Sequence, residues 1–417
     1  MSHEHFNREN FIMEVRGIVN SKIDITTEPN DAYIEELIRE EVFLKAKDLY
    51  LSISEKTEII QSIFNAMRRL DVLQPLIEDE SVTEIMVNGP DCIFIEKDGR
   101  VYQTNTKFES KQKLENVIQS IVSKVNRAVN EASPVVDARL EDGSRVSAVL
   151  PPIALNGPIL TIRKFSKEPM TMRKLIQYGS VTEDIADLLQ KLVEAKYNIF
   201  ICGGTGSGKT TFLNALSNFI PSDDRIVTIE DSAELQIANI PNLISLETRD
   251  ANVEGRGEVT MRDLIKTSLR MRPDRIVVGE VRGTEAIDML QAMNTGHDGS
   301  LSTGHANSTK DMLSRLETMV LGGANMPIEA IRSQISSALN VMVHLGRLRD
   351  KSRRVLEITE VLECENGQIR MNPLYKFVED REVDNRVIGS LKHTGNTLVE
   401  VDKLRMAGIQ LKGGLVK

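Results

Sequence analysis

The sequence predicts an α/β protein in which a larger domain with a mainly parallel sheet follows a smaller α+β domain and an N-terminal helical region. Strand-like and helix-like segments alternate after residue 180, and short β-type runs separated by tight turns occupy the stretch before it. A chain of 417 residues is also too long for one ordinary core. We therefore predict a helical region at 1–73, an α+β domain at 74–165, a linker at 166–180 and the larger domain, with a C-terminal extension, at 181–417.

The N-terminal region has the apolar spacing of amphipathic helices. Apolar residues recur every three or four positions at Ile34, Ile38 and Val42, and again at Ile59 and Ile63. Such stripes can dock a partner, but they more often pack on one another. We expect a small helical bundle here.

Short strands are predicted in the α+β stretch. An Asn-Gly-Pro turn splits two β-type runs, 82–87 and 92–96, and Asp98-Gly99 predicts a hairpin turn. A helical period follows at Leu114 to Val129, and Asp142-Gly143 separates two further strand-like runs. The order indicates a mostly antiparallel sheet.

The larger domain begins after a segment with the composition of a hinge. Ser166 to Ser180 contains Pro169 and Gly179 and few apolar residues, which favours a linker. The elements expected beyond it are a helix at 183–195, a strand at 198–202, a Gly-rich turn, a helix at 210–218 and strands at 225–229 and 275–278.

Composition narrows the class of protein. The chain has 41% hydrophobic and 27% charged residues, and we expect neither a membrane span nor a secretory signal, which favours a cytoplasmic protein. A net charge of -9, no tryptophan and only 4% aromatic residues argue against nucleic acid as the main ligand. The spacing of Cys92, Cys202 and Cys364 argues against zinc and against a disulfide framework.

The motif that carries the chemistry is a phosphate-binding loop. Residues 203–210 match G-x-x-x-x-G-K-[ST] between a predicted strand and a predicted helix. Glycines let the backbone N–H groups surround phosphates, Lys209 is expected to reach the β- and γ-phosphates, and the Thr210 hydroxyl to bind Mg²⁺. The predicted ligands are ATP and Mg²⁺, and the predicted nucleotide-binding residues are Gly203, Gly204, Thr205, Gly206, Ser207, Gly208, Lys209, Thr210 and Thr211.

Two acidic residues follow predicted strands of the same domain. Glu230 and Glu280 end the runs 225–229 and 276–279, so parallel strands would bring both carboxylates to the edge that holds the phosphate loop. Taken singly, each acid could be only a helix cap or a solvated turn residue. Gly279 stands where an Asp often precedes the second acid, so Mg²⁺ would depend on Thr210, phosphate oxygens and waters held by Glu280.

A Gly- and hydroxyl-rich segment at 295–308 contains two histidines, His297 and His305. We interpret it as a mobile loop, rich in donors, that senses the γ-phosphate. Metal binding and an ordinary turn with hydrogen-bonded histidines are the alternatives.

Arginines form a last group. Arg139, Arg145 and Arg163 lie in the smaller domain, and Arg270, Arg272 and Arg275 precede the second acidic strand. Most arginines are solvated surface residues. Guanidinium groups brought onto the phosphates from a second domain or subunit would nevertheless couple chemistry to movement.

The combined pattern resembles the secretion-ATPase superfamily, which powers type II and type IV secretion and pilus assembly. The tight-adherence (Flp-type) pilus branch is the most similar, and the resemblance covers about residues 74–350. Four stretches carry it, namely VTEIMVNGPDCIFIEKDGR at 82–100, the phosphate loop at 203–210, RMRPDRIVVGEVRG at 270–283 and TGHDGSLSTGHANS at 295–308.

The resemblance implies roles for individual residues of a RecA-like P-loop NTPase domain. Glu230 looks like the acid that polarises water, Glu280 like the Walker B acid and His305 like the histidine that faces the γ-phosphate. Arg145 and Arg163 lie where family members reach the nucleotide from the N-terminal domain. Arg139 is a weaker candidate for the same role.

The resemblance also implies an assembly. By the resemblance, the chain is expected to form a homohexamer that contacts the cytoplasmic face of the inner membrane peripherally and moves a polytopic platform protein. The charge balance predicts no direct nucleic acid binding. A hexameric DNA translocase or helicase of the RecA class is the main alternative, and stimulation of ATP hydrolysis by single-stranded DNA would favour it. A GTP-binding switch is a second alternative, although no Asn-Lys-x-Asp motif follows the phosphate loop. A small-molecule kinase would leave the histidine segment and the first domain without a role.

Overall fold

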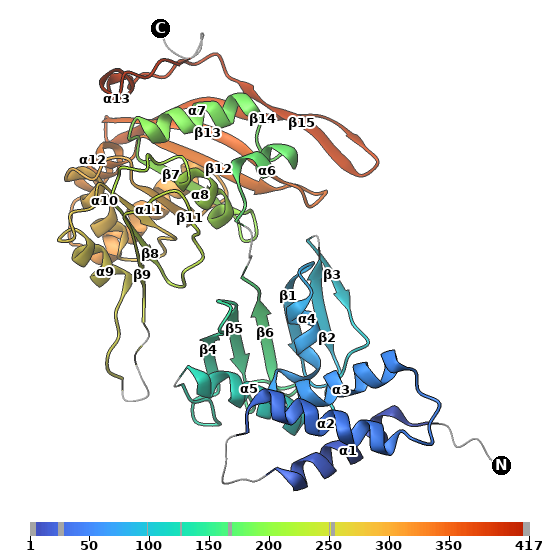
Figure 1. Cartoon of the computed structure of the whole chain (residues 1–417). Coiled ribbons are helices and arrows are strands. Elements are labelled where there is room, and N and C mark those ends of the chain that lie inside the picture. Colours follow the sequence, from blue (N-terminus) through green and yellow to red (C-terminus); the bar gives the residue numbers. More distant parts are fainter. Residues whose placement is uncertain are drawn as a thin grey trace. The chain divides into compact units, whose positions relative to one another are not determined.

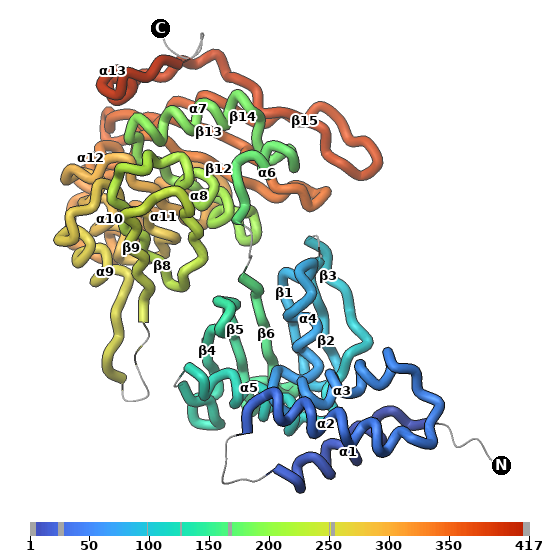
Figure 2. The backbone as a smooth tube through the Cα atoms, viewed as in Figure 1, coloured from blue at the N-terminus to red at the C-terminus, as the bar shows by residue number. Residues whose placement is uncertain are grey.

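The computed structural model contains two compact units, which we describe separately (Figures 1 and 2). Unit 1 is Met1–Ser166 and unit 2 is Lys167–Lys417. The predicted helical region and the α+β domain therefore share the first unit. The structure describes residues 6–23, 29–97, 99–125, 127–165, 169–249, 251 and 255–411, so Asp98 of the predicted hairpin turn and residues 166–168 of the predicted linker lie outside the described residues.

The first unit begins with three helices that pack on one another, as the apolar stripes predict. Their shared core contains Val15, Ile38 and Ile63, all buried. Ser52 and Glu55 form a capping box at the start of the third helix, which satisfies N–H groups that would otherwise lack partners. The helices are α1 (Arg8–Lys22), α2 (Asp31–Lys45) and α3 (Ile53–Arg68).

The sheet of the first unit is antiparallel throughout, as predicted. Its order is β3-β2-β1-β6-β5-β4, and Leu114, Ile118 and Ile121 of α5 pack in its core. The predicted helix at Leu114 to Val129 instead begins at Lys111, after the cap Ser110, and ends at Lys124. The elements are η1 (Asp71–Leu73), α4 (Gln74–Glu78), β1 (Val82–Asn88), β2 (Ile93–Lys97), β3 (Arg100–Gln103), α5 (Lys111–Lys124), β4 (Val135–Arg139), β5 (Arg145–Val149) and β6 (Ile159–Arg163).

Part of the predicted linker is a helix of the second unit. Residues Met172–Gln177 form α6, whose N-terminus is capped by the Thr171 side chain. Met172 and Leu175 are buried in the same core as α7. Met172 and Leu175 are three positions apart, so they lie on one side of the helix and hold this segment against the core, although its overall composition is that of a hinge.

The sheet of the second unit is parallel from β12 to the edge strand β9 and antiparallel from β12 to the opposite edge strand β15. Its order is β15-β14-β13-β12-β7-β11-β10-β8-β9, and the six strands from β12 to β9 run parallel. The strands are β7 (Ile199–Gly203), β8 (Ile226–Glu230), β9 (Leu243–Glu247), β10 (Arg275–Val278), β11 (Leu301–His305), β12 (Val341–Arg347), β13 (Arg353–Glu365), β14 (Gln368–Val383) and β15 (Arg386–His393).

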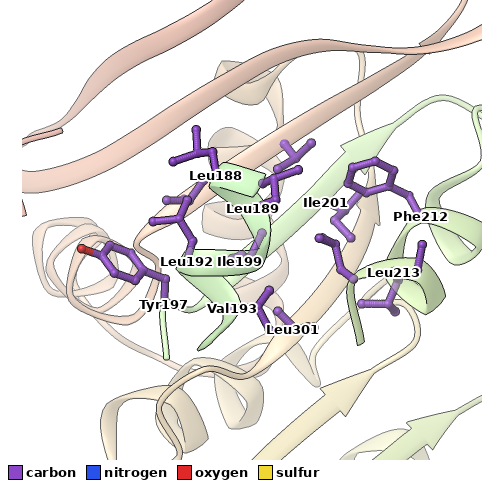
Figure 3. Close-up of a cluster of buried hydrophobic side chains, with 14 of the residues drawn as sticks. Leu188, Leu189, Leu192, Val193, Tyr197, Ile199, Ile201, Phe212, Leu213 and Leu301 are labelled. Atoms are coloured by element: carbon purple, nitrogen blue, oxygen red, sulfur yellow. The ribbon is translucent and has the colours of Figure 1, made fainter. Parts of the chain in front are cut away.

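Helices cover both faces of this sheet and bury it. Ile199 and Ile201 of β7 point into one core with α7 and α8 (Figure 3). Phe200 and Cys202 belong to the other core, with α10 to α12. Each such large apolar side chain contributes about 1.5–3 kcal/mol when fully buried. The helices are α7 (Glu183–Glu194), α8 (Lys209–Ser217), α9 (Met261–Ser268), α10 (Ala286–Asn294), α11 (Thr309–Gly323), α12 (Ile328–Ala338) and α13 (Asp402–Met406).

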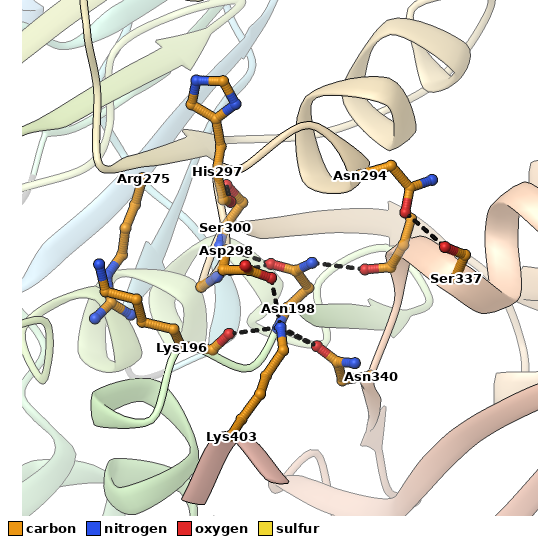
Figure 4. Close-up of polar contacts among 12 residues, drawn as sticks. Lys196, Asn198, Arg275, Asn294, His297, Asp298, Ser300, Ser337, Asn340 and Lys403 are labelled. Carbon is orange, nitrogen blue, oxygen red and sulfur yellow. Dashed lines mark hydrogen bonds and ion pairs between the residues drawn. The ribbon is translucent and has the colours of Figure 1, made fainter. Parts of the chain in front are cut away.

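A buried polar network connects residues at the amino ends of the parallel strands with one another (Figure 4). Arg275 is fully buried, and its Nε donates to Asp224 at 2.6 Å. The Asn198 side chain accepts hydrogen bonds from the N–H groups of Gly299 and Ser300. Arg275 starts β10, whereas Glu280 follows the other end of that strand. Arg275 therefore stabilises the fold and lies away from the strand end that Glu280 follows.

The cysteines differ in exposure. Cys202 is buried, whereas Cys92 of the first unit and Cys364 of the second are partly exposed. Burial raises the pKa of the Cys202 thiol to about 12.

Candidate active site

The strand order of the second sheet brings four predicted site elements to neighbouring positions. In the row β7, β11, β10 and β8, the phosphate loop follows β7, His305 ends β11, Glu280 lies just beyond β10 and Glu230 ends β8. Parallel strands all end at the same edge, where ligand clefts form. Gly203 and His305 are opposite each other in the pairing of β7 with β11.

The phosphate loop has the backbone conformation that its glycines allow. Gly206 and Gly208 have φ of +71° and +92°, in the left-handed region that disfavours other residues. Inside the loop, the Ser207 hydroxyl donates to the Gly204 carbonyl at 2.8 Å. Helix α8 starts at Lys209, directly after this turn, so its N-terminal N–H groups and positive dipole end lie at the loop.

A chain of charged and polar side chains crosses this edge of the sheet. Lys209 Nζ lies 3.3 Å from His305 Nδ1 and 3.4 Å from His305 Nε2, and 3.2 Å from the Gly204 carbonyl. His305 Nε2 is 2.7 Å from Glu280 Oε1. The other oxygen of Glu280 accepts a hydrogen bond from Arg282 Nε at 2.8 Å. The structure therefore brings Lys209, His305 and Glu280 together, as predicted from the sequence.

Burial lowers the pKa of two of these side chains, Lys209 and His305. Burial lowers the pKa of Lys209, and the nearby carboxylate of Glu280 opposes that change. Burial also lowers the pKa of His305, with further lowering from Lys209 and Arg282 and an opposing effect of Glu280. A neutral imidazole can donate from one nitrogen and accept at the other. His305 Nε2 lies next to the Glu280 carboxylate, and both ring nitrogens lie within 3.4 Å of Lys209 Nζ.

His305 does not lie in a mobile loop, so that interpretation of 295–308 is wrong for residues 301–305. They form strand β11, in which Ser302 and Thr303 are buried. A Cβ at Gly304 would lie 2.9 Å from Met312 and 3.0 Å from Phe200, so the glycine is there for close packing rather than for flexibility. Thr303 donates its hydroxyl hydrogen to the Gly279 carbonyl at 2.7 Å.

Glu230 lies at the same edge, but its described contacts differ from those of Glu280. Its carboxylate is buried and accepts hydrogen bonds from the N–H groups of Glu234, at 2.9 Å, and Leu235, at 3.2 Å. A Cβ at Gly279 would lie 2.9 Å from Glu230 Cγ. The missing Asp before Glu280 thus has a steric reason, because any side chain at position 279 would collide with Glu230.

The predicted arginines of the first unit lie side by side across its sheet. Arg145 is opposite Arg163 on the next strand, and Arg139 is opposite Arg145 on the other side. Glu84 of β1 continues the row next to Arg163. Burial raises the pKa of Glu84, Glu96 raises it further, and Arg163 opposes the shift.

Two further arginines of the site were not predicted. Arg282 contacts Glu280 and also lies 3.2 Å from Asp231, so it joins the segments that follow β8 and β10. Arg353, the first residue of β13, donates to the carbonyl of Gly206 in the phosphate loop at 2.8 Å. The motif at 270–283 contains Arg282, but nothing local in the sequence connects residue 353 with residue 206.

The donor set fits Mg²⁺ bound together with a nucleotide. Thr210, in the first turn of α8, offers a hydroxyl, and Glu280 offers a carboxylate at the same edge. Among the residues that the structure describes, no three His, Cys, Asp or Glu side chains gather as a metal-binding group. Mg²⁺ suits such a site, because it keeps water and phosphate ligands and needs few protein groups.

Together, a phosphate loop, a strand-end acid and a histidine between them on a parallel sheet define a P-loop nucleoside triphosphatase. Comparison with known proteins narrows this class. Residues 66–395 match the family model described as type II/IV secretion system protein. The chain belongs to the type II/IV secretion system protein family, and it is an ATP hydrolase of that family.

Individual relatives agree with this assignment. A putative conjugal transfer protein of Mycobacterium tuberculosis is 37% identical over 301 residues, which cover 70% of this chain and 85% of the relative. The type IV secretion system protein VirB11 of Brucella suis is 32% identical over 303 residues, covering 66% of this chain and 84% of VirB11. Nothing in the comparisons supports the DNA-translocase alternative.

A solved structure has a similar fold. The ATPase DotB of Yersinia pseudotuberculosis superposes with a TM-score of 0.50 at 16% identity, covering 69% of this chain and 77% of DotB. This likeness concerns the fold alone. Within the described residues, no helix combines the length and the apolar character needed to cross a bilayer.

Proposed function

We propose that the chain is a Mg²⁺-dependent motor ATPase that works as a homohexamer and moves a membrane-embedded platform protein of a pilus or secretion machine. One observation carries the chemical part of the proposal. Lys209, His305 and Glu280 form a continuous row from the phosphate loop to the neighbouring strand ends, with contacts of 2.7–3.4 Å. This row can bind a terminal phosphoryl group, detect it and orient the water that attacks it.

Each residue of the row has a distinct proposed task. Lys209 binds the β- and γ-phosphates, and its shift from His305 toward phosphate would report that the triphosphate is present. Glu280 accepts a hydrogen bond from the attacking water, while His305 and Arg282 hold its carboxylate in a fixed orientation. Thr210 and Glu280 would hold Mg²⁺, which neutralises charge on the phosphates when it is bound.

Glu230 and the arginines of the first unit are proposed as supporting groups. We propose Glu230 as a second acid that polarises water. The close approach of Gly279 supports this proposal, since it puts Glu230 beside the strand that leads to Glu280. Arg145 and Arg163 are proposed to reach the phosphates in the assembled protein and to stabilise the charge of the transition state. Their adjacency on β5 and β6 lets them act as a pair.

The proposed setting follows from family membership and from the four sequence stretches named above. Relatives carry names of conjugal transfer and type IV secretion proteins. We propose the tight-adherence pilus branch for this chain, a location at the cytoplasmic face of the inner membrane, and peripheral rather than spanning membrane contact. No direct role for nucleic acid is proposed.

Phosphate release and native mass, measured on the same samples, test the proposal. Wild type with ATP and Mg²⁺ is expected to form a hexamer and hydrolyse ATP. Lys209→Ala is expected to lose hydrolysis, and Arg163→Ala to assemble but turn over slowly. Arg100→Ala is the matched control, because Arg100 is an exposed arginine on the edge strand β3 of the same sheet. Full activity in a monomer would contradict the ring mechanism, and stimulation by single-stranded DNA would favour a translocase.

A further inference from the structure

The turn between β12 and β13 lies against the phosphate loop. Arg353 Nε donates to the Gly206 carbonyl at 2.8 Å, and a Cβ at Gly208 would lie 3.5 Å from Arg353 Cδ. A Cβ at Gly206 would lie 4.0 Å from Nη1 of Arg347, the last residue of β12. Two arginines that are distant in sequence therefore flank the two left-handed glycines of the loop.

The contact of Arg353 orients the peptide that joins Gly206 to Ser207. The carbonyl and N–H groups of one planar peptide point in opposite directions. A Gly206 carbonyl held toward Arg353 therefore turns the Ser207 N–H into the loop, where it donates to the Gly204 carbonyl at 3.3 Å. Gly206 and Gly208 impose little conformational preference themselves, so the hydrogen bond from Arg353 adds to the internal bonds of Ser207 in selecting this arrangement.

The same strand holds the chain that leads back to the first unit. Arg354 Nη1 donates to the Gly179 carbonyl at 3.2 Å, and the Val355 N–H donates to the Ser180 carbonyl at 3.0 Å. Gly179 and Ser180 lie between α6, which ends at Gln177, and α7, which begins at Glu183. Successive side chains of a strand point to opposite faces, which lets Arg353 and Arg354 contact different segments. Three consecutive residues of β13 thus touch the phosphate loop and the segment at 179–180.

We propose that β13 couples the nucleotide state of the phosphate loop to the segment at 179–180, with Arg353 as the positioning residue. This inference rests on the proposed function, since it requires ATP to bind at the loop. A triphosphate draws loop N–H groups toward itself, and the rotation of the Gly206 peptide moves the guanidinium that is bound to it. Strand β13 is hydrogen-bonded to β12 and β14, so it moves as a stiff element and carries the change to Gly179 and Ser180.

Two measurements on the full chain test the inference. The first is the Kd of a fluorescent ATP analogue with Mg²⁺, and the second is hydrogen exchange at the Val355 amide with and without the analogue. We expect the analogue to change Val355 exchange in wild type. In Arg353→Ala we expect Kd to rise about tenfold and the nucleotide dependence of exchange to vanish.

Arg349→Ala is the matched control. Arg349 lies in the turn before β13 and is also exposed, but it pairs with Glu379 and Glu382 of β14. Wild-type Kd and wild-type exchange are expected for it. Arg354→Ala is expected to keep the wild-type Kd and to weaken the nucleotide dependence of exchange, because it removes the contact with Gly179, along with those to Val387 and Phe377, but leaves the Arg353 contact in place.

The outcomes separate the inference from the function on which it rests. Nucleotide binding that leaves Val355 exchange unchanged in wild type would overturn the inference, as would an Arg353→Ala variant that responds like wild type. Failure of wild type to bind the analogue at all would instead remove the proposed function. If Arg353→Ala melts at a lower temperature, Arg353→Met, which keeps a long apolar stem but has no donor and no charge, replaces it. The methionine variant is expected to behave like Arg353→Ala, and a wild-type Kd with wild-type exchange would again overturn the inference.

Discussion

The two sheets of this protein organise charged side chains in different ways. In the second unit, parallel strands end at one edge, so residues that end four different strands or follow them directly become neighbours there. In the first unit, antiparallel strands place Arg139, Arg145, Arg163 and Glu84 in a row across the sheet, one residue to each strand. The parallel sheet thus gathers the proposed catalytic side chains at one edge, whereas the antiparallel sheet distributes charged side chains over neighbouring strands.

This difference predicts different responses to substitution. Loss of one member of a concentrated site removes a task that no neighbour can take over. Loss of one member of a row leaves similar groups at the next positions. Four experiments test whether the comparison holds, beginning with the largest expected effect.

Glu280→Gln is expected to reduce ATP turnover by about 10²- to 10³-fold, because the amide cannot accept the proton or orient the water as a carboxylate does. Steady-state phosphate release measures the loss. Glu329→Gln, an exposed position of α12, is the control and is expected to keep wild-type turnover. Turnover within threefold of wild type in Glu280→Gln would mean that the strand-end cluster is not the centre of the chemistry.

Gly279→Ala is expected to destabilise the second unit by about 1–3 kcal/mol, because the new Cβ would lie 2.9 Å from Glu230 Cγ. Urea unfolding followed by circular dichroism measures the change. Gly322→Ala in α11 is the control, since its Cβ would meet only Thr284 Cγ2, at 3.8 Å. Unchanged stability in Gly279→Ala would show that the edge is looser than these contacts indicate.

Arg163→Ala and Arg145→Ala are each expected to slow turnover by about tenfold, a milder effect because the row still holds the other arginine. The double variant is expected to lose more than the product of the two single effects. A double-mutant cycle on kcat measures this coupling. Strict additivity would indicate that the two arginines act separately and would weaken the contrast between the two sheets.

His305 is expected to give a small pH-dependent effect. Burial lowers its pKa, so the folded chain favours the neutral imidazole and the unfolded chain takes up the proton first as pH falls. The stability that this provides is present above about pH 6.5 and is lost as the pH falls from there through the folded pKa.

Unfolding midpoints at pH 7.5 and pH 5.5 measure the slope. Wild type is expected to lose more stability on acidification than His305→Gln, and His393→Gln reports the effect of removing an exposed imidazole. The groups that face His305 are Glu280, Lys209, Arg282 and Arg315. A steeper slope in His305→Gln than in wild type would contradict the assigned direction.

Much of the fold follows from local signals. The apolar periods of α2 and α3, the turn between β1 and β2, and the strand before the phosphate loop each depend on residues close together in sequence. The grouping of the loop with His305 and Glu280 could be predicted because the motifs carry it and because parallel strands share one edge.

The remaining features depend on packing between distant residues. Segment 301–305 has the composition of a loop, yet Gly304 is a contact point for Met312 and Phe200 in a buried strand. Helix α6 is too short to show a helical repeat of apolar residues, and it is stabilised by packing of Met172 and Leu175 in the core. The contact of Arg353 with Gly206 spans 147 positions of sequence and leaves no local trace.

The distribution of the thiols has a practical consequence. Cys202 is buried, and its raised pKa keeps it protonated near neutral pH, so maleimide reagents should spare it. Cys92 and Cys364 are partly exposed and lie in different units. The natural chain therefore carries a labelling site on each unit for a fluorophore pair, and changes in their separation during turnover can be followed without engineering a new cysteine.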